Sequence, residues 1–366
     1  MHHHDRSRIR GEGLRALARG ARALAGAAMV AGAALHASPC AGQEVEHLRI
    51  VGGLGALNQY TRHEVPFWTQ QLKALSGGRV SAEIVPSDRA GIRPQEMLRL
   101  VQLGVVQFGT SLLNVSSGVD AEIAMPDLAG LNPDVATMRR TLAAFRPHLE
   151  RVLRERFGSE LLAVYAYPAQ VTFCAKPLTG LADLKGRKIR FSSSTQSDWV
   201  TALGAIPVQT PFNDIVANVK SGNVDCAITG TMSGNTIGLY EVMTHLHTMP
   251  VNWGIAIFVA NGGAWAALSK ETQELLRREL PKLEKAIWTE AESETSNGIA
   301  CNTGSASCIG GRLGNMVVVR ATPADDAKRQ EILARNVLPA YLKRCGPRCA
   351  QVWNQTVGSS SGIALP

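Results

Sequence analysis

The chain has 366 residues, of which 45% are hydrophobic and 19% are charged. This length exceeds the usual size of one hydrophobic core, so we expect two domains. The composition is that of a globular protein and excludes collagen-like repeats and small disulfide scaffolds. Residues 1–42 hold six arginines against Asp5 and Glu12, which accounts for +4 of the net charge of +8. The rest has no basic run with interleaved aromatic residues, which argues against a nucleic-acid partner.

The N-terminal segment has the pattern of an export signal. Arginines precede the apolar stretch from Leu24 to Leu35, and small residues continue to Gly42. About 12 apolar residues form a helix of about 18 Å, too short for a hydrocarbon core of about 30 Å. The sequence therefore predicts a cleaved signal peptide over 1–42 and a periplasmic location. Cys40 raises the alternative of lipidation, although the preceding Pro39 fits that cleavage pattern poorly.

Six cysteines remain after cleavage, and export permits disulfides. Cys301 and Cys308 enclose a small polar loop and Cys345 and Cys349 a turn, so both pairs are candidates for local bridges or for one crossed pair. The pairing stays open across the set Cys174, Cys226, Cys301, Cys308, Cys345 and Cys349. The spacings lack the paired CxxC or histidine partners of zinc sites, so we expect neither a metal nor a cofactor.

From residue 47 the chain alternates strand-like and helix-like patterns. The first series predicts strands at 47–51, 80–85 and 106–113, and helices at 61–75, 94–103 and 134–157. The second predicts strands at 161–167, 171–175, 187–192, 208–210 and 224–229, and helices at 195–203 and 213–220. Two long helices follow at 271–298, with Pro281 as a possible kink, and at 323–345.

This order predicts an α/β protein with two lobes, each with a largely parallel sheet. The expected domain I comprises 43–167 and part of 254–295, and domain II comprises 168–253 and part of 296–366. Hinge strands and a long bridging helix would connect them. The cleft between such lobes is the default ligand site.

Each stretch that resembles an enzyme motif lacks a residue that the motif requires. The glycine-rich turn 52–58 has Asn58 where a dinucleotide loop needs its third glycine. The stretch 230–234 has its serine one place late for a nucleophile elbow. His245 and His247 have no acidic cluster near them, and Cys226 lies in an apolar strand, typical of a buried small hydrophobe.

Arg190 is the basic residue of greatest interest. In the strand pattern it points opposite to Ile189, but Arg187 and Lys188 are basic too, so the pattern alone fits a solvated strand end equally well.

Several segments together resemble the solute-binding receptors of TRAP transporters. They are 77–81, 102–108, Leu181–Arg190, Leu203–Val208, Pro211–Ile215 and Ser221–Asp225. The resemblance covers most of 46–290 and is most specific in its central third. It implies a bilobal periplasmic-binding-protein fold, a small organic carboxylate as ligand and an integral-membrane permease as partner. It also implies that Arg190 binds the ligand carboxylate and that Phe212 packs on the ligand. A monomer is expected.

Two positions depart from the family pattern. Gln170 stands where many acidic-sugar receptors have a second arginine, and Thr229 stands where asparagine is common. Losing a cation while keeping polar groups favours a monocarboxylate, such as an aromatic, hydroxy or keto acid, because a second buried charge would be unmatched.

Further candidates for ligand contact lie at predicted strand ends: Asn58, Ser111, Asn114 and Trp253. Two alternatives remain open at this point. One is a receptor that feeds a sensor kinase, and the other is a periplasmic hydrolase or lyase that uses Cys226 or His247.

Overall fold

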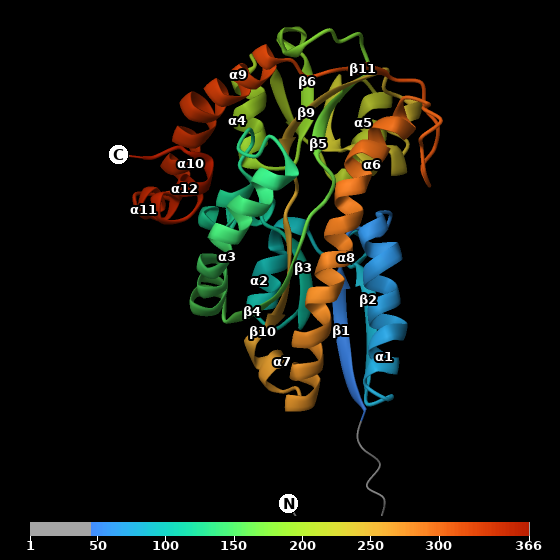
Figure 1. Ribbon diagram of the computed structural model, residues 1–366, viewed down its shortest axis with the longest axis vertical. Helices are drawn as coiled ribbons and strands as arrows, with labels where there is room; N and C mark the ends of the chain where they lie inside the picture. Colours follow the sequence, from blue (N-terminus) through green and yellow to red (C-terminus); the bar gives the residue numbers. More distant parts are fainter. Residues whose placement is uncertain (1–44, 366) are drawn as a thin grey trace, which may run out of the picture. The chain divides into compact units, whose positions relative to one another are not determined.

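The computed structural model describes residues 45–365, which belong to one compact unit. The predicted signal peptide and Cys40 lie outside the described residues. The described part contains two sheets, each with its own helices (Figure 1). We call the part around the first sheet lobe I and the part around the second lobe II. This two-lobed α/β architecture confirms the predicted fold class.

Lobe I contains a five-stranded sheet in the order β2-β1-β3-β10-β4. Its strands are β1 (Glu46–Gly52), β2 (Val80–Pro86), β3 (Phe108–Leu112), β4 (Ser159–Tyr165) and β10 (Ala256–Asn261). β1 runs parallel to β2 and β3, but β10 is antiparallel to both β3 and β4. β2, β1, β3 and β4 therefore run in the same direction, which agrees with the predicted largely parallel sheet, and β10, which arrives from lobe II, is the one strand that runs the opposite way.

Lobe II contains a six-stranded sheet in the order β11-β9-β5-β8-β6-β7. Its strands are β5 (Gln170–Cys174), β6 (Lys188–Phe191), β7 (Ile206–Gln209), β8 (Cys226–Gly230), β9 (His245–Asn252) and β11 (Val317–Val319). β6 is parallel to β7 and β8, whereas β5 is antiparallel to β8 and β9. β9 runs parallel to β11, so this sheet too is largely parallel, with β5 as its one reversed strand. The side of β6 that carries Arg190 is buried rather than solvated.

The chain crosses between the lobes at two short segments, one from β4 to β5 and one from β9 to β10. Asp127, fully buried, accepts hydrogen bonds from the backbone N–H groups of Trp253 (2.9 Å), Gly254 (2.9 Å) and Ile255 (3.3 Å) in the second segment. Gly254 has a φ of +66°, a conformation that glycine adopts without penalty. One carboxylate thus fixes the backbone of this crossing.

The long helix α8 (Lys270–Asn302) runs along both lobes (Figure 1). In lobe I the indole N–H of Trp288 donates to the carbonyl of Val164 (2.8 Å), and in lobe II the hydroxyl of Thr231 donates to the carbonyl of Glu294 (3.0 Å). Pro281 lies inside the helix, which continues past it. The predicted bridging helix is therefore confirmed and is longer than its periodicity indicated.

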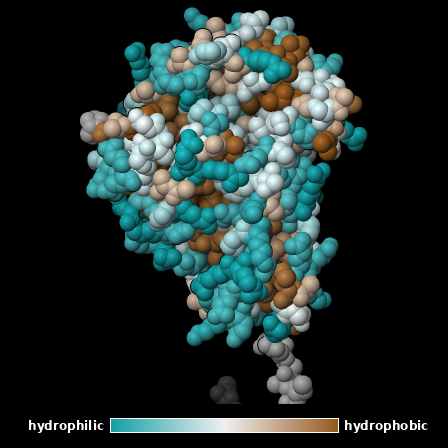
Figure 2. All heavy atoms as spheres, in the orientation of Figure 1, coloured by the Kyte–Doolittle hydropathy of each residue, from teal (hydrophilic) through white to brown (hydrophobic). Residues whose placement is uncertain are grey.

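The remaining helices cover the sheets and the C-terminal region. They are α1 (Leu72–Leu75), α2 (Met97–Gln102), α3 (Val135–Phe157), α4 (Ser194–Ala202), α5 (Ile215–Lys220), α6 (Thr231–Thr236), α7 (Gly262–Ala266), α9 (Pro323–Ile332), α10 (Leu338–Cys345), α11 (Arg348–Gln355) and α12 (Val357–Ser361). α3 begins after Asp134, whose side chain accepts from the N–H of Thr137, and α12 packs against it. Within residues 45–365 we find no helix with the length and apolar character of a membrane span. The face in Figure 2 is mostly hydrophilic, with apolar residues in scattered patches.

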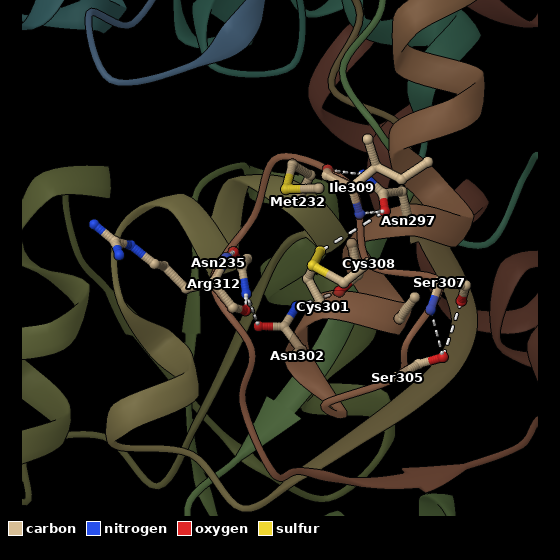
Figure 3. The surroundings of a disulfide bond; sticks show 12 residues. Met232, Asn235, Asn297, Cys301, Asn302, Ser305, Ser307, Cys308, Ile309 and Arg312 are labelled. Carbon is tan, nitrogen blue, oxygen red and sulfur yellow. Dashed lines mark hydrogen bonds between the residues drawn. A yellow bond between two sulfur atoms is a disulfide. The ribbon is translucent and has the colours of Figure 1, made fainter.

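Three disulfides connect the six cysteines of the described region: Cys174–Cys226, Cys301–Cys308 and Cys345–Cys349. The two local pairs are those that the short spacings suggested, and Cys301–Cys308 closes the loop shown in Figure 3. Cys226 is buried, as its apolar strand indicated, and antiparallel β5 and β8 place it directly opposite Cys174, which settles the pairing that the sequence left open.

Candidate functional site

A cavity of about 550 Å³ lies between the lobes. A volume of this size falls within the range of pockets for small organic molecules. Its lining comes from the ends of β1 and β3 and the segment 87–97 in lobe I, and from β5, β6, β8 and the segment 209–213 in lobe II. Of the eight residues that the sequence proposed for ligand contact, six line it: Ser111, Asn114, Gln170, Arg190, Phe212 and Thr229.

Arg190 reaches the cavity from β6, which lies between β7 and β8. Its Nε donates to the carbonyl of Thr210 (3.0 Å) and its Nη1 to the carbonyl of Ile228 (2.7 Å). These two bonds, one to each side of the strand, fix the plane of the guanidinium. Nη2 has no hydrogen-bond partner among the described residues. The side chain is therefore pre-oriented and keeps donors for a ligand.

The charge of Arg190 is not balanced by any described residue. The residue is only 4% exposed, and no described carboxylate lies within salt-bridge distance of it. Desolvation by burial lowers the pKa of its guanidinium to about 10, so the group remains charged at neutral pH. A buried cation without a counter-charge is costly, and a bound anion would remove that cost.

Hydroxyl and amide groups surround Arg190 on lobe II. Thr229 and Ser233 follow from β8 and α6, and Gln170 comes from β5. The amide oxygen of Gln170 accepts from Nε2 of Gln196 (3.1 Å), which leaves the amide nitrogen of Gln170 for other contacts. This arrangement surrounds the guanidinium of Arg190 with uncharged polar groups on lobe II.

The other two candidates lie away from this cavity. Asn58 donates to a carboxylate oxygen of Glu294 on α8. Trp253 is 4% exposed, and its indole N–H donates to the carbonyl of Asn132 (3.0 Å). Both side chains are turned toward structural partners, so neither belongs to the lining.

Several lining residues escaped the sequence analysis. Asp88 contributes from lobe I and Asn213 from lobe II, and their side chains form a hydrogen bond of 3.0 Å. Asn213 lies next to Phe212 in the Pro211–Ile215 segment, so its neighbourhood was visible in the sequence. Asp88 follows β2 in a short turn and carried no comparable signal.

The buried carboxylate of Glu64 lies behind the lobe I wall of the cavity. Glu64 accepts hydrogen bonds from the N–H of Gly53 (2.7 Å) and from the hydroxyl of Thr110 (3.0 Å), both of which are lining residues. Burial raises the pKa of this carboxyl to about 7, because desolvation outweighs the hydrogen bonds it receives. Among the described residues there is no group of three or more His, Cys, Asp or Glu arranged to hold a metal ion.

Two α/β lobes joined by short crossing segments, with a ligand-sized cavity between them, define a bilobal solute-binding protein. The particular family follows from sequence comparison. Residues 55–335 match the model of bacterial extracellular solute-binding protein, family 7, and the chain belongs to this family. It is a periplasmic solute-binding protein of the TRAP type. Members of this class are receptors rather than enzymes, and Cys226 is held in a disulfide in any case.

Two characterised relatives show moderate similarity. The chain is 26% identical over 265 residues to the outer membrane transporter protein TsaT of Comamonas testosteroni, which covers 70% of this chain and 75% of that protein. It is 27% identical over 121 residues to the ectoine-binding periplasmic protein TeaA of Halomonas elongata, covering 33% and 36% of the two chains.

Solved structures match over nearly their whole length. The receptor DctP7 of Bordetella pertussis, which binds pyroglutamic acid, superposes with a TM-score of 0.74 at 21% identity, covering 85% of this chain and 99% of that chain. A TRAP solute-binding protein of Desulfovibrio salexigens with bound orotic acid gives 0.75 at 20% identity, covering 87% and 99%. At these identities the likeness establishes the fold.

Proposed function

We propose that this protein binds a small organic monocarboxylate through Arg190 and delivers it to the membrane permease of a TRAP transporter. The observation that carries the proposal is the buried, pre-oriented guanidinium of Arg190, which faces a ligand-sized cavity with no described carboxylate to balance it. A guanidinium suits this task because its parallel N–H donors match the two oxygens of a carboxylate.

A single carboxylate fits the charges of the lining better than two. Arg190 is the one buried cation of the described lining, and Arg93 lies at an exposed position where it pairs with Glu96 (3.5 Å). Asp88 adds a carboxylate on the opposite lobe, which would repel a second acidic group of the ligand. Aromatic, hydroxy and keto acids are the first candidates. The acids bound by the structural neighbours, pyroglutamic and orotic acid, each give a starting compound.

Replacing Arg190 with methionine tests the carboxylate site. Methionine keeps apolar volume but removes the charge and the donors. We expect a loss of about 2–5 kcal/mol in the binding free energy of every acid that binds the wild type, measured by calorimetry after a thermal-shift screen of small carboxylic acids. Arg187→Met is the matched control, since Arg187 is half-buried outside the cavity lining and donates to the carbonyls of Lys176 and Pro177.

The control variant should bind as the wild type does. Circular dichroism of Arg190→Met should show a folded protein, because the residue forms no ion pair with the described part of the chain. Wild-type affinity in a folded Arg190→Met protein would refute the assignment of the carboxylate site.

A further inference from the structure

The two walls of the cavity differ in chemistry, and this difference defines the ligand further. We infer that the ligand is an acid with an apolar body, bound with its carboxylate against lobe II and its body against lobe I. This inference rests on the function proposed above and adds the class of acid and its orientation.

On lobe II, polar side chains of the lining have unused hydrogen-bonding capacity. The hydroxyls of Thr210, Thr229 and Ser233 have no hydrogen-bond partner in the described part of the chain, although each residue is at least nine-tenths buried. Nη2 of Arg190 also has no hydrogen-bond partner among the described residues. All four residues line the cavity, and none of these atoms is among the fully buried atoms without a partner, so they are open to a ligand there. These four residues therefore form a wall prepared for a ligand that brings several hydrogen-bond acceptors close together, as a carboxylate does.

On lobe I, several polar side chains of the lining are already engaged within the protein, although Oδ1 of Asn114 has no hydrogen-bond partner among the described residues. The hydroxyl of Thr110 donates to Glu64 (3.0 Å), and that of Ser111 pairs with Ser116 (2.7 Å). Asn114 donates to Asp127 (3.3 Å). Asp88 accepts from the N–H of Gly55 (2.9 Å) and from Asn213. Hydroxyl groups of a ligand would find few free partners on this wall.

Most of the rest of the lobe I wall is apolar, although Ser87, Arg93 and Gln95 also line it. Leu54, Leu57, Ile92, Met97 and Leu112 line it. Phe212 of lobe II closes the same region and packs against the apolar residues of both lobes. A hydrocarbon surface on the ligand would be buried here at about 0.8 kcal/mol per methylene group.

These two walls discriminate against polyhydroxylated acids. A hexuronate has the required carboxylate, but its ring hydroxyls would face leucine, isoleucine and methionine side chains and lose their hydrogen bonds to water. An aryl or cycloalkyl acid of similar size loses no such bonds.

The orientation predicts how affinity changes along a series of ligands. We expect the affinity of the wild type for straight-chain acids from propionate to hexanoate to rise about fourfold per methylene group, and cyclohexanecarboxylate to bind more tightly than galacturonate. Calorimetry or competition binding measures both. A flat series, or tighter binding of galacturonate, would overturn the inference while leaving the carboxylate site intact. If no acid of either kind binds, the proposed function itself fails.

Two variants test which wall of the cavity contacts the carboxylate and which contacts the apolar body of the ligand. Thr229→Val keeps the shape of the side chain and removes its hydroxyl, so it should weaken propionate and cyclohexanecarboxylate by a similar factor, about tenfold. Leu112→Ala shortens the opposite wall and should weaken cyclohexanecarboxylate about tenfold while changing propionate less than about twofold. The reverse pattern would contradict the orientation. A thermal melt of each variant without ligand reports whether it is folded.

Discussion

Asp88 of lobe I and Asn213 of lobe II are joined by a hydrogen bond of 3.0 Å across the cavity between the lobes. The carboxylate of Asp88 is held for this contact by the N–H of Gly55, which donates to its other oxygen (2.9 Å). Next to Asn213, the ring of Phe212 packs against the apolar residues of both lobes. One short turn of lobe II thus provides a polar and an apolar contact with lobe I.

This contact should stabilise the closed arrangement of the lobes. In a two-state equilibrium between open and closed forms, removing a bond present only in the closed form shifts the population toward the open form. We expect Asn213→Ala to lower the ratio of closed to open protein about 3- to 10-fold without ligand. Asn223→Ala is the control, because Asn223 is exposed and donates to Asn218 within lobe II.

The distance between the lobes reports this shift directly. Spin labels at Lys73→Cys on α1 and Lys220→Cys on α5 occupy exposed positions, one on each lobe. Pulsed distance measurements, in a background with Cys40 replaced by alanine, should show longer distances for Asn213→Ala than for the wild type or the control. Identical distributions in all three proteins would show that the contact does not hold the lobes together.

The buried acid Glu64 makes stability depend on pH. Burial raises the pKa of its carboxyl from an ordinary value of 4.5 to about 7 in the folded chain. Folding therefore favours the protonated form, so the stabilisation is complete below about pH 4.5 and is lost as the pH rises through 7. The full loss for this group is on the order of 3 kcal/mol.

Glu64→Gln should remove this dependence at little structural cost. The amide oxygen can accept from the N–H of Gly53, and the amide nitrogen can donate to the hydroxyl of Thr110. In urea titrations between pH 5 and 8, we expect the variant to gain stability relative to the wild type as the pH rises. Glu155→Gln, at an exposed helical position, serves as control and should follow the wild type. A constant difference across this range would refute the assignment.

The sequence predicted the elements well because their patterns are local. Alternation placed β1 and β2, and helical spacing placed α3 and α8. It missed β10, whose residues Ala256–Asn261 are almost uniformly buried and so do not alternate. Its antiparallel insertion between β3 and β4 is a property of the topology and leaves no local signal.

The candidate site likewise combines residues that the sequence identified with residues whose orientation depends on distant parts of the chain. Arg190 and Phe212 were found through segments that resemble a known family, and the cavity brings them together. Asn58 and Trp253 were proposed because they lie near predicted strand ends and crossings. The side chains of Asn58 and Trp253 instead point toward Glu294 and Asn132. These partners are distant in sequence, so no local pattern identifies them.

The disulfides allow a test of how covalent links contribute to stability. Cys174 and Cys226 are separated by 52 positions, and Cys301 and Cys308 by 7. The entropy of loop closure in the unfolded chain predicts about 4 kcal/mol for the first and about 2 kcal/mol for the second. Replacing each pair with alanines and measuring urea denaturation should therefore show a larger loss for Cys174–Cys226. Equal losses would mean that strain or residual structure, rather than loop length, sets the contribution.

Replacing Gly298 with alanine tests whether helix propensity or packing against α6 has the larger effect on stability at this position. Gly298 lies inside α8, where alanine would ordinarily add about 1 kcal/mol of stability. However, a Cβ at this position would overlap the backbone N of Met232 and the backbone C of Thr231 in α6. Because both atoms belong to the main chain, a side-chain rotation cannot relieve the overlap. We expect Gly298→Ala to lower the free energy of unfolding by about 1–3 kcal/mol.

The comparison that decides this point is Gly118→Ala, since a Cβ at Gly118 would meet no atom within 4 Å. That variant should unfold at nearly the same denaturant concentration as the wild type, whereas Gly298→Ala should unfold earlier. A stabilised Gly298→Ala protein would show that α6 and α8 can separate at low cost. Because α8 runs along lobe I as well, such looseness would let lobe II move relative to the helix, and closure of the cavity would then involve α6 as well as the two crossing segments.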